Sequence, residues 1–269
     1  MAGPGGRFLE VDGERIHLVE RGSGPPLLLV HGFPSNATAW RAVMDRLEPH
    51  FAMVAPDIVG FGQSTRRPRR PLTGEDYADR LVGLLDALEL EHLNVAGLSW
   101  GGSVVQRLAA RHPERVDRLV LVASVSAGRV LALSDANLLG LAVAIRFPRV
   151  GRLAVRRFLT RAAADPHLPL DELVRGYVDP LQVPGTLAVL RRFVRDTAAS
   201  APIDIGRVRA PTLVIVPQAD RIVLPDVGAE IAASIPDARL EELPGVGHAV
   251  QFEAPDRVAE LMRAFLADA

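Results

Sequence analysis

Residues 93–102 read LNVAGLSWGG, an apolar run that leads into the motif GLSWGG. The run has the composition of a buried strand, and residues 103–111 carry apolar side chains at helical spacing. We therefore expect Ser99 at a sharp turn from strand to helix, with Gly97 and Gly101 leaving room for a strained backbone. Such a turn holds a hydroxyl in front of the sheet, at a helix N-terminus that favours developing negative charge.

Strand and helix patterns alternate on both sides of this stretch. Residues 8–11 and 15–20 alternate in polarity around a central Asp-Gly pair, which predicts an antiparallel hairpin at the N-terminus. Further strands are predicted at 27–30, 51–56, 119–124, 212–217 and 238–243. The segments between most of them have helical spacing, so the fold class is α/β, a mostly parallel sheet of about eight strands with helices on both faces.

This rhythm breaks between residues 126 and 202. The segment has no convincing strand pattern, is rich in helix-forming residues and is interrupted by prolines. We expect residues 126–202 to form a helical cap inserted into a core domain made of residues 1–125 and 203–269.

Composition narrows the possible partners. The 269 residues have a formal net charge of -1, which gives no electrostatic reason to expect a nucleic-acid partner, and a small-molecule substrate is expected instead. The chain has no cysteine, no signal-peptide pattern and no apolar stretch long enough to span a membrane. We expect a cytoplasmic monomer or homodimer with no membrane span.

Several polar residues follow predicted strand ends, and loops at the carboxyl ends of parallel strands converge on one crevice. They are His31, Asp57, Ser99, Asp220 and His248. The other histidines form no ligand pair, so neither a metal nor a cofactor is expected.

With these motifs and their order, the chain resembles the α/β-hydrolase family from residue 8 to its last predicted helix. The resemblance implies that Ser99 is the nucleophile, that His248 is the general base and acid, and that Asp220 orients the imidazole. Asp226 lies nearby as a competing carboxylate, and a capping role for it is the alternative.

The resemblance also implies an oxyanion hole made by the backbone N–H groups of Phe33 and Trp100. Beside it, His31 and Gly32 are expected to support the oxyanion loop, and Asp57 to hold a glycine turn. A substrate pocket is predicted from apolar side chains of the cap and of the strand ends: Trp100, Leu138, Leu139, Phe147 and Val223.

Within the family, the motifs around Phe33 and Trp100 resemble the branch of epoxide hydrolases, haloalkane dehalogenases and carbon–carbon bond hydrolases. Many enzymes of this branch use an aspartate where this chain has Ser99, and a serine paired with histidine suits attack on an acyl carbon. The leading hypothesis is hydrolysis of a small, largely apolar carboxylic ester or lactone through an acyl-enzyme. The alternatives are a carbon–carbon bond hydrolase of a ring-cleavage pathway, a thioesterase, and a non-hydrolytic binder, oxygenase or perhydrolase on the same fold.

Overall fold

A single mixed sheet organises the chain in the computed structural model, which describes residues 6–128, 142–143 and 145–267. The strand order is β1-β2-β4-β3-β5-β6-β7-β8. The eight strands are β1 Gly6–Val11, β2 Glu14–Arg21, β3 Pro26–Val30, β4 Ala52–Pro56, β5 Leu93–Leu98, β6 Val116–Val122, β7 Thr212–Pro217 and β8 Ala238–Leu243. β2 runs antiparallel to both β1 and β4, and the remaining pairs are parallel. The predicted fold class is confirmed.

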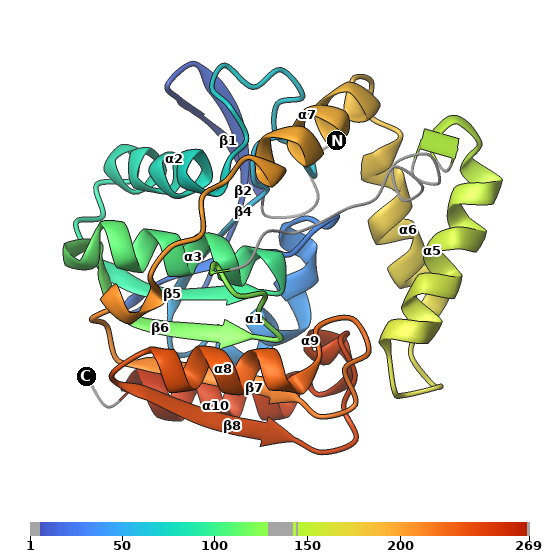
Figure 1. The fold of residues 1–269 in the computed structure, drawn as a ribbon. Coiled ribbons are helices and arrows are strands. Elements are labelled where there is room, and N and C mark those ends of the chain that lie inside the picture. Colours follow the sequence, from blue (N-terminus) through green and yellow to red (C-terminus); the bar gives the residue numbers. More distant parts are fainter. Residues whose placement is uncertain (1–5, 129–141, 144, 268–269) are drawn as a thin grey trace.

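Helices cover both faces of the sheet (Figure 1). The α-helices whose bounds lie within the described residues are α1 Arg41–Leu47, α2 Gly74–Ala87, α3 Trp100–Arg111, α5 Pro148–Ala162, α6 Leu170–Leu181, α7 Thr186–Ala198, α8 Pro225–Ser234, α9 Val250–Glu253 and α10 Pro255–Ala267. Short 3-10 helices occur at η1 Ala37–Trp40, η2 Pro113–Arg115 and η3 Ile205–Arg207. One buried cluster packs α2, α3 and α8 on one sheet face, and a second packs α1 and α10 on the other.

Local residues decide where two of these helices begin, and a further short helix carries no sequence signal. The segment after β3 is not one helix but η1 followed by α1, because the Asn36 side chain accepts a hydrogen bond from the Thr38 amide and starts a tighter turn. α8 begins at Pro225, where proline's fixed φ suits a first helical turn. The one-turn helix α9, directly after His248, was not predicted.

α5, α6 and α7 lie between β6 and β7 in the sequence, and no strand occurs among the described residues of this segment. α5 and α6 stand beside the carboxyl ends of the strands, at the right of Figure 1. Their apolar side chains form a third small cluster, which also includes Ala249 from the chain after β8. The helical segment therefore packs against the edge of the sheet at which the predicted site residues lie.

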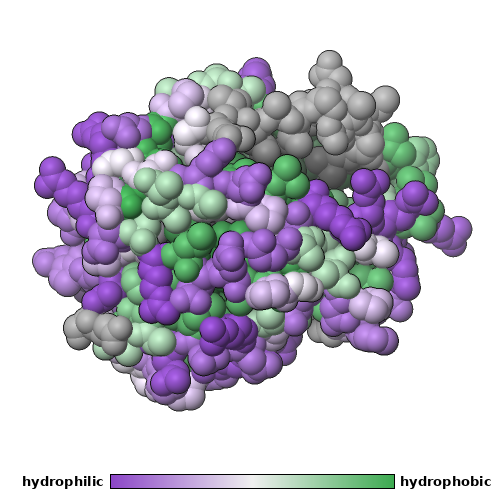
Figure 2. Space-filling model, turned by 60° about the horizontal axis from the view of Figure 1, so that its bottom comes forward, coloured by the Kyte–Doolittle hydropathy of each residue, from purple (hydrophilic) through white to green (hydrophobic). Residues whose placement is uncertain are grey.

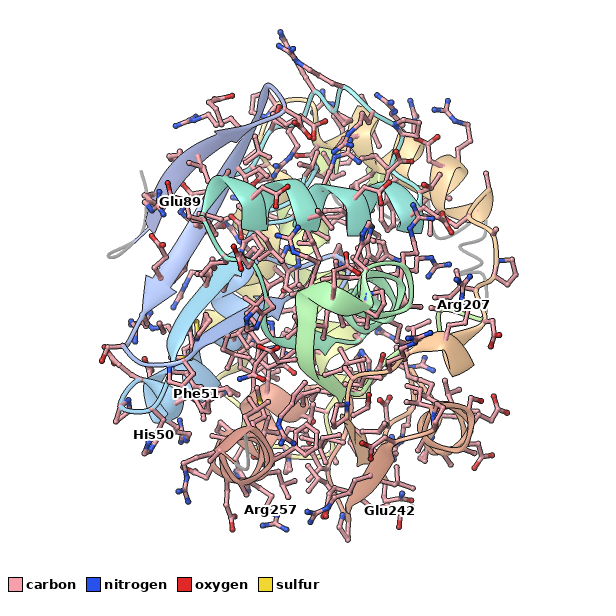
Figure 3. The ribbon with its side chains drawn as sticks, turned by 90° about the vertical axis from the view of Figure 1, so that its left-hand side faces the viewer. His50, Phe51, Glu89, Arg207, Glu242 and Arg257 are labelled. Atoms are coloured by element: carbon pink, nitrogen blue, oxygen red, sulfur yellow. The ribbon has the colours of Figure 1, made fainter. Side chains whose placement is uncertain are left out.

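The amino ends of the parallel strands lie at the opposite edge of the sheet, away from the predicted site residues. Figure 3 shows this side, where His50 and Phe51 precede β4, Glu89 precedes β5 and Arg207 precedes β7. The face that carries α8, β8 and α10 mixes polar and apolar side chains (Figure 2). Within the described residues, no helix is long and apolar enough to cross a membrane.

Candidate active site

Ser99 occupies a strained turn between β5 and α3. Its backbone has φ 51° and ψ -120°, a left-handed conformation that costs a non-glycine residue free energy. Hydrogen bonds on both sides hold it: the Ser99 amide donates to the Val122 carbonyl at 2.9 Å, and the Ser99 carbonyl accepts from the Gly102 and Val125 amides at 3.0 Å each. The turn fixes the hydroxyl at the N-terminus of α3.

Two glycines allow the backbone to approach this turn closely. A Cβ atom at Gly97 would lie 2.5 Å from Val105 Cγ2 and 2.7 Å from the Gly101 carbonyl oxygen. A Cβ atom at Gly32 would lie 3.0 Å from Ser99 Cβ. The separations at Gly97 are shorter than a Cβ atom tolerates, so that position requires glycine, and the tight contact at Gly32 shows how closely the loop after β3 approaches the turn.

The structure brings Ser99, His248 and Asp220 together in one hydrogen-bonded line. Ser99 Oγ lies 3.1 Å from His248 Nε2, and His248 Nδ1 lies 2.7 Å from Asp220 Oδ2. Because an ionised carboxylate only accepts, the network assigns the proton to Nδ1 and leaves Nε2 to accept from the serine hydroxyl. Asp226 instead lies in the first turn of α8, whose N-cap residue is Leu224 and which has no side-chain cap hydrogen bond, so the alternative capping role of Asp226 is not observed.

The loops that carry this line are fixed by further hydrogen bonds. Asp220 Oδ1 accepts from the amides of Ile222 and Val223 at 2.7 and 2.9 Å, which orients the carboxylate. The His248 amide donates to the carbonyl of Ala162, the last residue of α5, at 2.7 Å. His248 is therefore held through its imidazole by Asp220 at the sheet edge and through its backbone by the end of α5.

Glu253 strengthens the same junction. Its Oε2 accepts from the amides of Ala164 and Asp165 at 2.7 and 3.0 Å, and from the Gly247 amide at 3.1 Å. One carboxylate thus joins the turn after α5 to the loop that carries His248, so the positions of α5 and of His248 are coupled.

The two predicted oxyanion donors lie next to Ser99. Trp100 is the first residue of α3, so its amide has no carbonyl partner within the helix. Phe33 follows Gly32 and lines the same pocket as Ser99. The Trp100 indole, by contrast, is 3% exposed and packs edge-on against Tyr77 and Phe193, each 5.0 Å away between ring centres. The side chain expected in the pocket therefore packs in the core.

His31 braces the oxyanion loop from behind. Its Nε2 accepts from the Ile58 amide at 3.1 Å, which leaves Nδ1 to donate to the Gly32 carbonyl at 2.8 Å. Complete burial lowers the pKa of the His31 imidazole, and the neutral form is the one that these two bonds require.

Asp57 ties several loops together beneath the site. Its carboxylate accepts from the amides of Ala37 and Gln63, both at 2.7 Å, and lies 2.9 Å from His17 Nδ1. The side chain is buried, and the loops that it links follow β3 and β4. Its contacts are those of a structural anchor.

A small pocket opens beside Ser99. Its volume is about 20 Å³, room for about one water molecule, and its polar lining side chains are Ser35, Ser99, Tyr177, His248 and Gln251. A groove of about 620 Å³ adjoins it, and the two cavities share Ser35 and Tyr177. The Tyr177 hydroxyl hydrogen-bonds to Ser35, and burial raises the pKa of Tyr177, so this phenol is neutral at pH 7.

The other predicted pocket residues that the structure describes do not line this cavity. Phe147 is 53% exposed before α5, and Val223 is half-buried, with its amide bonded to Asp220. Leu138 and Leu139 lie outside the described residues. Tyr177 and Gln251 were missed because neither belongs to a motif, although Gln251 follows His248 by only three positions. No three His, Cys, Asp or Glu side chains among the described residues are grouped as a metal site would need.

Fold and site together have the features of an α/β-type hydrolase, and comparison with known proteins agrees. A family model described as alpha/beta hydrolase fold matches residues 25–255. The chain therefore belongs to the alpha/beta hydrolase fold family, as its sequence predicts.

Named relatives indicate the branch. The chain is 35% identical to 2-hydroxymuconate semialdehyde hydrolase of Pseudomonas sp. (strain CF600), over 98% of this chain and 94% of that protein. Its fold matches a meta-cleavage product hydrolase of Pseudomonas fluorescens IP01 with a TM-score of 0.81 at 27% identity, covering 97% of both chains. It also matches a thermophilic esterase of Thermogutta terrifontis with a TM-score of 0.79 at 27% identity, covering 98% of both chains. The chain is a hydrolase, and its relatives favour the carbon–carbon alternative over ester hydrolysis.

Proposed function

We propose that the chain is a serine hydrolase that cleaves a carbon–carbon bond next to a carbonyl group, in a substrate of the kind that ring cleavage produces. The observation that carries the proposal is the 35% identity, over nearly the whole chain, to a 2-hydroxymuconate semialdehyde hydrolase. The line from Ser99 through His248 to Asp220 supports it, because this arrangement activates a hydroxyl for attack on a carbonyl carbon.

In the proposed reaction, Ser99 Oγ attacks the carbonyl carbon while His248 Nε2 takes the hydroxyl proton. The amides of Phe33 and Trp100 stabilise the oxyanion, and Asp220 stabilises the imidazolium. This step acts on the keto form of the substrate, in which the enol proton has moved to the carbon next to the reacting carbonyl. The carbon–carbon bond then breaks, its electron pair passes through the neighbouring double bond to the keto oxygen as a dienolate, and the imidazolium returns the proton to this departing fragment. Water, activated by His248, attacks the acyl-enzyme and releases the acid and Ser99.

Residues 126–202 are the proposed cap over this site. Because the pocket beside Ser99 holds only about one water molecule, a substrate enters only after a lining side chain moves. Tyr177 of α6 separates the pocket from the larger groove, so its displacement would join the two cavities into one site.

The test is turnover of 2-hydroxymuconate semialdehyde, followed by loss of its absorbance, against hydrolysis of 4-nitrophenyl esters of increasing acyl length. We expect kcat/KM for the semialdehyde to exceed that for every ester, and both activities to disappear in Ser99→Ala. Ester hydrolysis without semialdehyde cleavage would reject the carbon–carbon proposal, and activity in Ser99→Ala would reject the nucleophile.

Carboxylic ester hydrolysis is the second candidate. It is supported by the match to a solved esterase and by the composition of the pocket, since His248 is the only titratable side chain besides Tyr177 among its described lining residues. A neutral ester would fit such surroundings, and the same two assays separate the candidates.

A further inference from the structure

The polar side chains of the pocket beside Ser99 are already paired, with one exception. Ser99 bonds to His248, and the hydroxyls of Ser35 and Tyr177 bond to each other. The Gln251 side chain remains: its Oε1 is buried and has no hydrogen-bond partner among the residues that the structure describes. Each buried polar atom of this kind in a folded protein calls for an explanation.

Gln251 is fixed in position. It lies in α9 and is 2% exposed. The helix begins two residues after His248, and Glu253, its last residue, anchors it to the Gly247 amide and to the turn after α5. A long, flexible amide is thus held at the pocket while its acceptor is left unpaired, which is unfavourable in the absence of a ligand.

We propose that the Gln251 carboxamide is a specificity-determining contact that accepts a hydrogen bond from a substrate hydroxyl. The orphan atom is an acceptor, so the group that it lacks is a donor, and a neutral amide pairs with a neutral hydroxyl without burying an unpaired charge. An enol hydroxyl conjugated with the reacting carbonyl is a donor of this kind. The inference rests on the proposed function, in which such an enol reaches Ser99.

The contact distinguishes substrates by the cost of leaving Gln251 unpaired. A ligand with the hydroxyl satisfies the buried acceptor, whereas an otherwise identical ligand without it does not. We expect the hydroxylated ligand to bind about tenfold more tightly, which is the typical effect of one such hydrogen bond.

The experiment measures ligand binding in the Ser99→Ala protein, where no turnover occurs. The ligands are 2-hydroxymuconate semialdehyde and muconate semialdehyde, which lacks the 2-hydroxyl, and the variant is Gln251→Met, of similar size but without an acceptor. Gln218→Met, at an exposed glutamine that bonds to Glu242, is the matched control. We expect the tenfold preference to fall to about one in Gln251→Met and to persist in the control.

Thermal unfolding gives a second readout. Replacing an unpaired buried amide by an apolar side chain of similar shape is neutral or stabilising, so Gln251→Met should unfold at the same or a higher temperature. A preference that survives Gln251→Met, no preference in the parent protein, or no binding of either ligand would overturn the inference. Failure of the wild type to cleave the semialdehyde, with the preference intact, would reject only the proposed reaction.

Discussion

Two of the Asp–His pairs among the described residues have a buried aspartate, and only one of these two lines the pocket beside Ser99. His248 Nδ1 lies 2.7 Å from Asp220, and His17 Nδ1 lies 2.9 Å from Asp57. Both aspartates follow strands, β7 and β4, and both carboxylates are almost completely buried. The imidazoles differ: that of His248 is 13% exposed and lines the pocket, whereas that of His17 is 4% exposed within the protein.

Each pair also has a serine nearby, and the serines are used differently. Ser99 Oγ lies 3.1 Å from the free ring nitrogen of His248. Ser64 Oγ accepts from the His17 backbone amide at 2.9 Å and donates to the Asp57 carbonyl. Its hydroxyl is therefore bonded to backbone groups and not to the imidazole. A serine, a histidine and an aspartate in proximity are therefore not enough for nucleophilic catalysis. The serine must also lie on a strained turn that presents its hydroxyl to a pocket.

The largest expected effect separates the two serines. Ser99→Ala should lower kcat by about 10⁴- to 10⁶-fold because no other group can attack the carbonyl carbon. Ser64→Ala should leave kcat near that of the unmodified protein but lower the free energy of unfolding by about 1–3 kcal/mol, since it leaves a buried amide unpaired. Steady-state kinetics and urea denaturation of both variants provide the check, and a large loss of kcat with normal stability in Ser64→Ala would contradict it.

The aspartates should separate in the same way, with smaller effects. Asp220→Asn keeps the shape but presents an amide to His248 and favours the wrong tautomer, so kcat should fall by about 10⁴-fold at nearly unchanged stability. Asp57→Asn should chiefly reduce stability, by about 1–3 kcal/mol for each buried donor left unpaired. Kinetics and denaturation midpoints measured together test this, and equal losses of kcat in the two variants would remove the distinction.

The sequence predicted much of the geometry that makes this difference. Strand ends could be read from apolar runs, and because parallel strands share an edge, residues as far apart as Ser99 and His248 were expected side by side. The same rule also placed Asp57 at that edge, and its contacts match the structural role that its glycine-rich turn suggested.

The pocket could not be predicted in this way. Trp100 was expected to face the substrate because it follows Ser99, but its orientation depends on Phe193 of α7, which lies 93 residues further along the chain. Tyr177 and Gln251 line the pocket from helices with no motif to mark them. Tertiary packing decides which side of a helix meets the cavity, and a single sequence does not contain that packing.

His31 is buried and forms no ion pair with a carboxylate of the described residues, so it tests how burial alone makes the free energy of unfolding depend on pH. Burial lowers the pKa of His31 below its unfolded value of about 6.5, so below that pH the unfolded chain binds more protons. Stability should be fully present above about pH 6.5 and fall by up to about 1.4 kcal/mol per pH unit as the pH decreases toward the folded pKa.

Urea denaturation at pH 5.5 and 7.5 checks this, and the dependence should weaken in His31→Asn. His92 is the matched control: its pairing with Asp117 raises the pKa, which gives the opposite sign, and solvent screens this exposed pair. A pH dependence unchanged in His31→Asn would show that other groups cause it.

The smallest expected effect concerns the access of substrate to the pocket that His248 lines. If Tyr177 must leave Ser35 before substrate reaches Ser99, binding includes the cost of breaking one hydrogen bond, about 0.5–1.5 kcal/mol. Tyr177→Phe removes that cost and should lower KM by about two- to tenfold with little change in kcat.

Ser35→Ala removes the same hydrogen bond from the other side, so it should lower KM to a similar extent. The double variant should then show no further decrease, because the two substitutions remove one shared interaction. Additive effects would mean that the two hydroxyls act separately on the substrate, and a raised KM in Tyr177→Phe would mean that the phenol binds the substrate. Either result would mean that Tyr177 binds the substrate and does not act as a barrier between pocket and groove. The difference between the His248 and His17 pairs would then not depend on the movement of Tyr177.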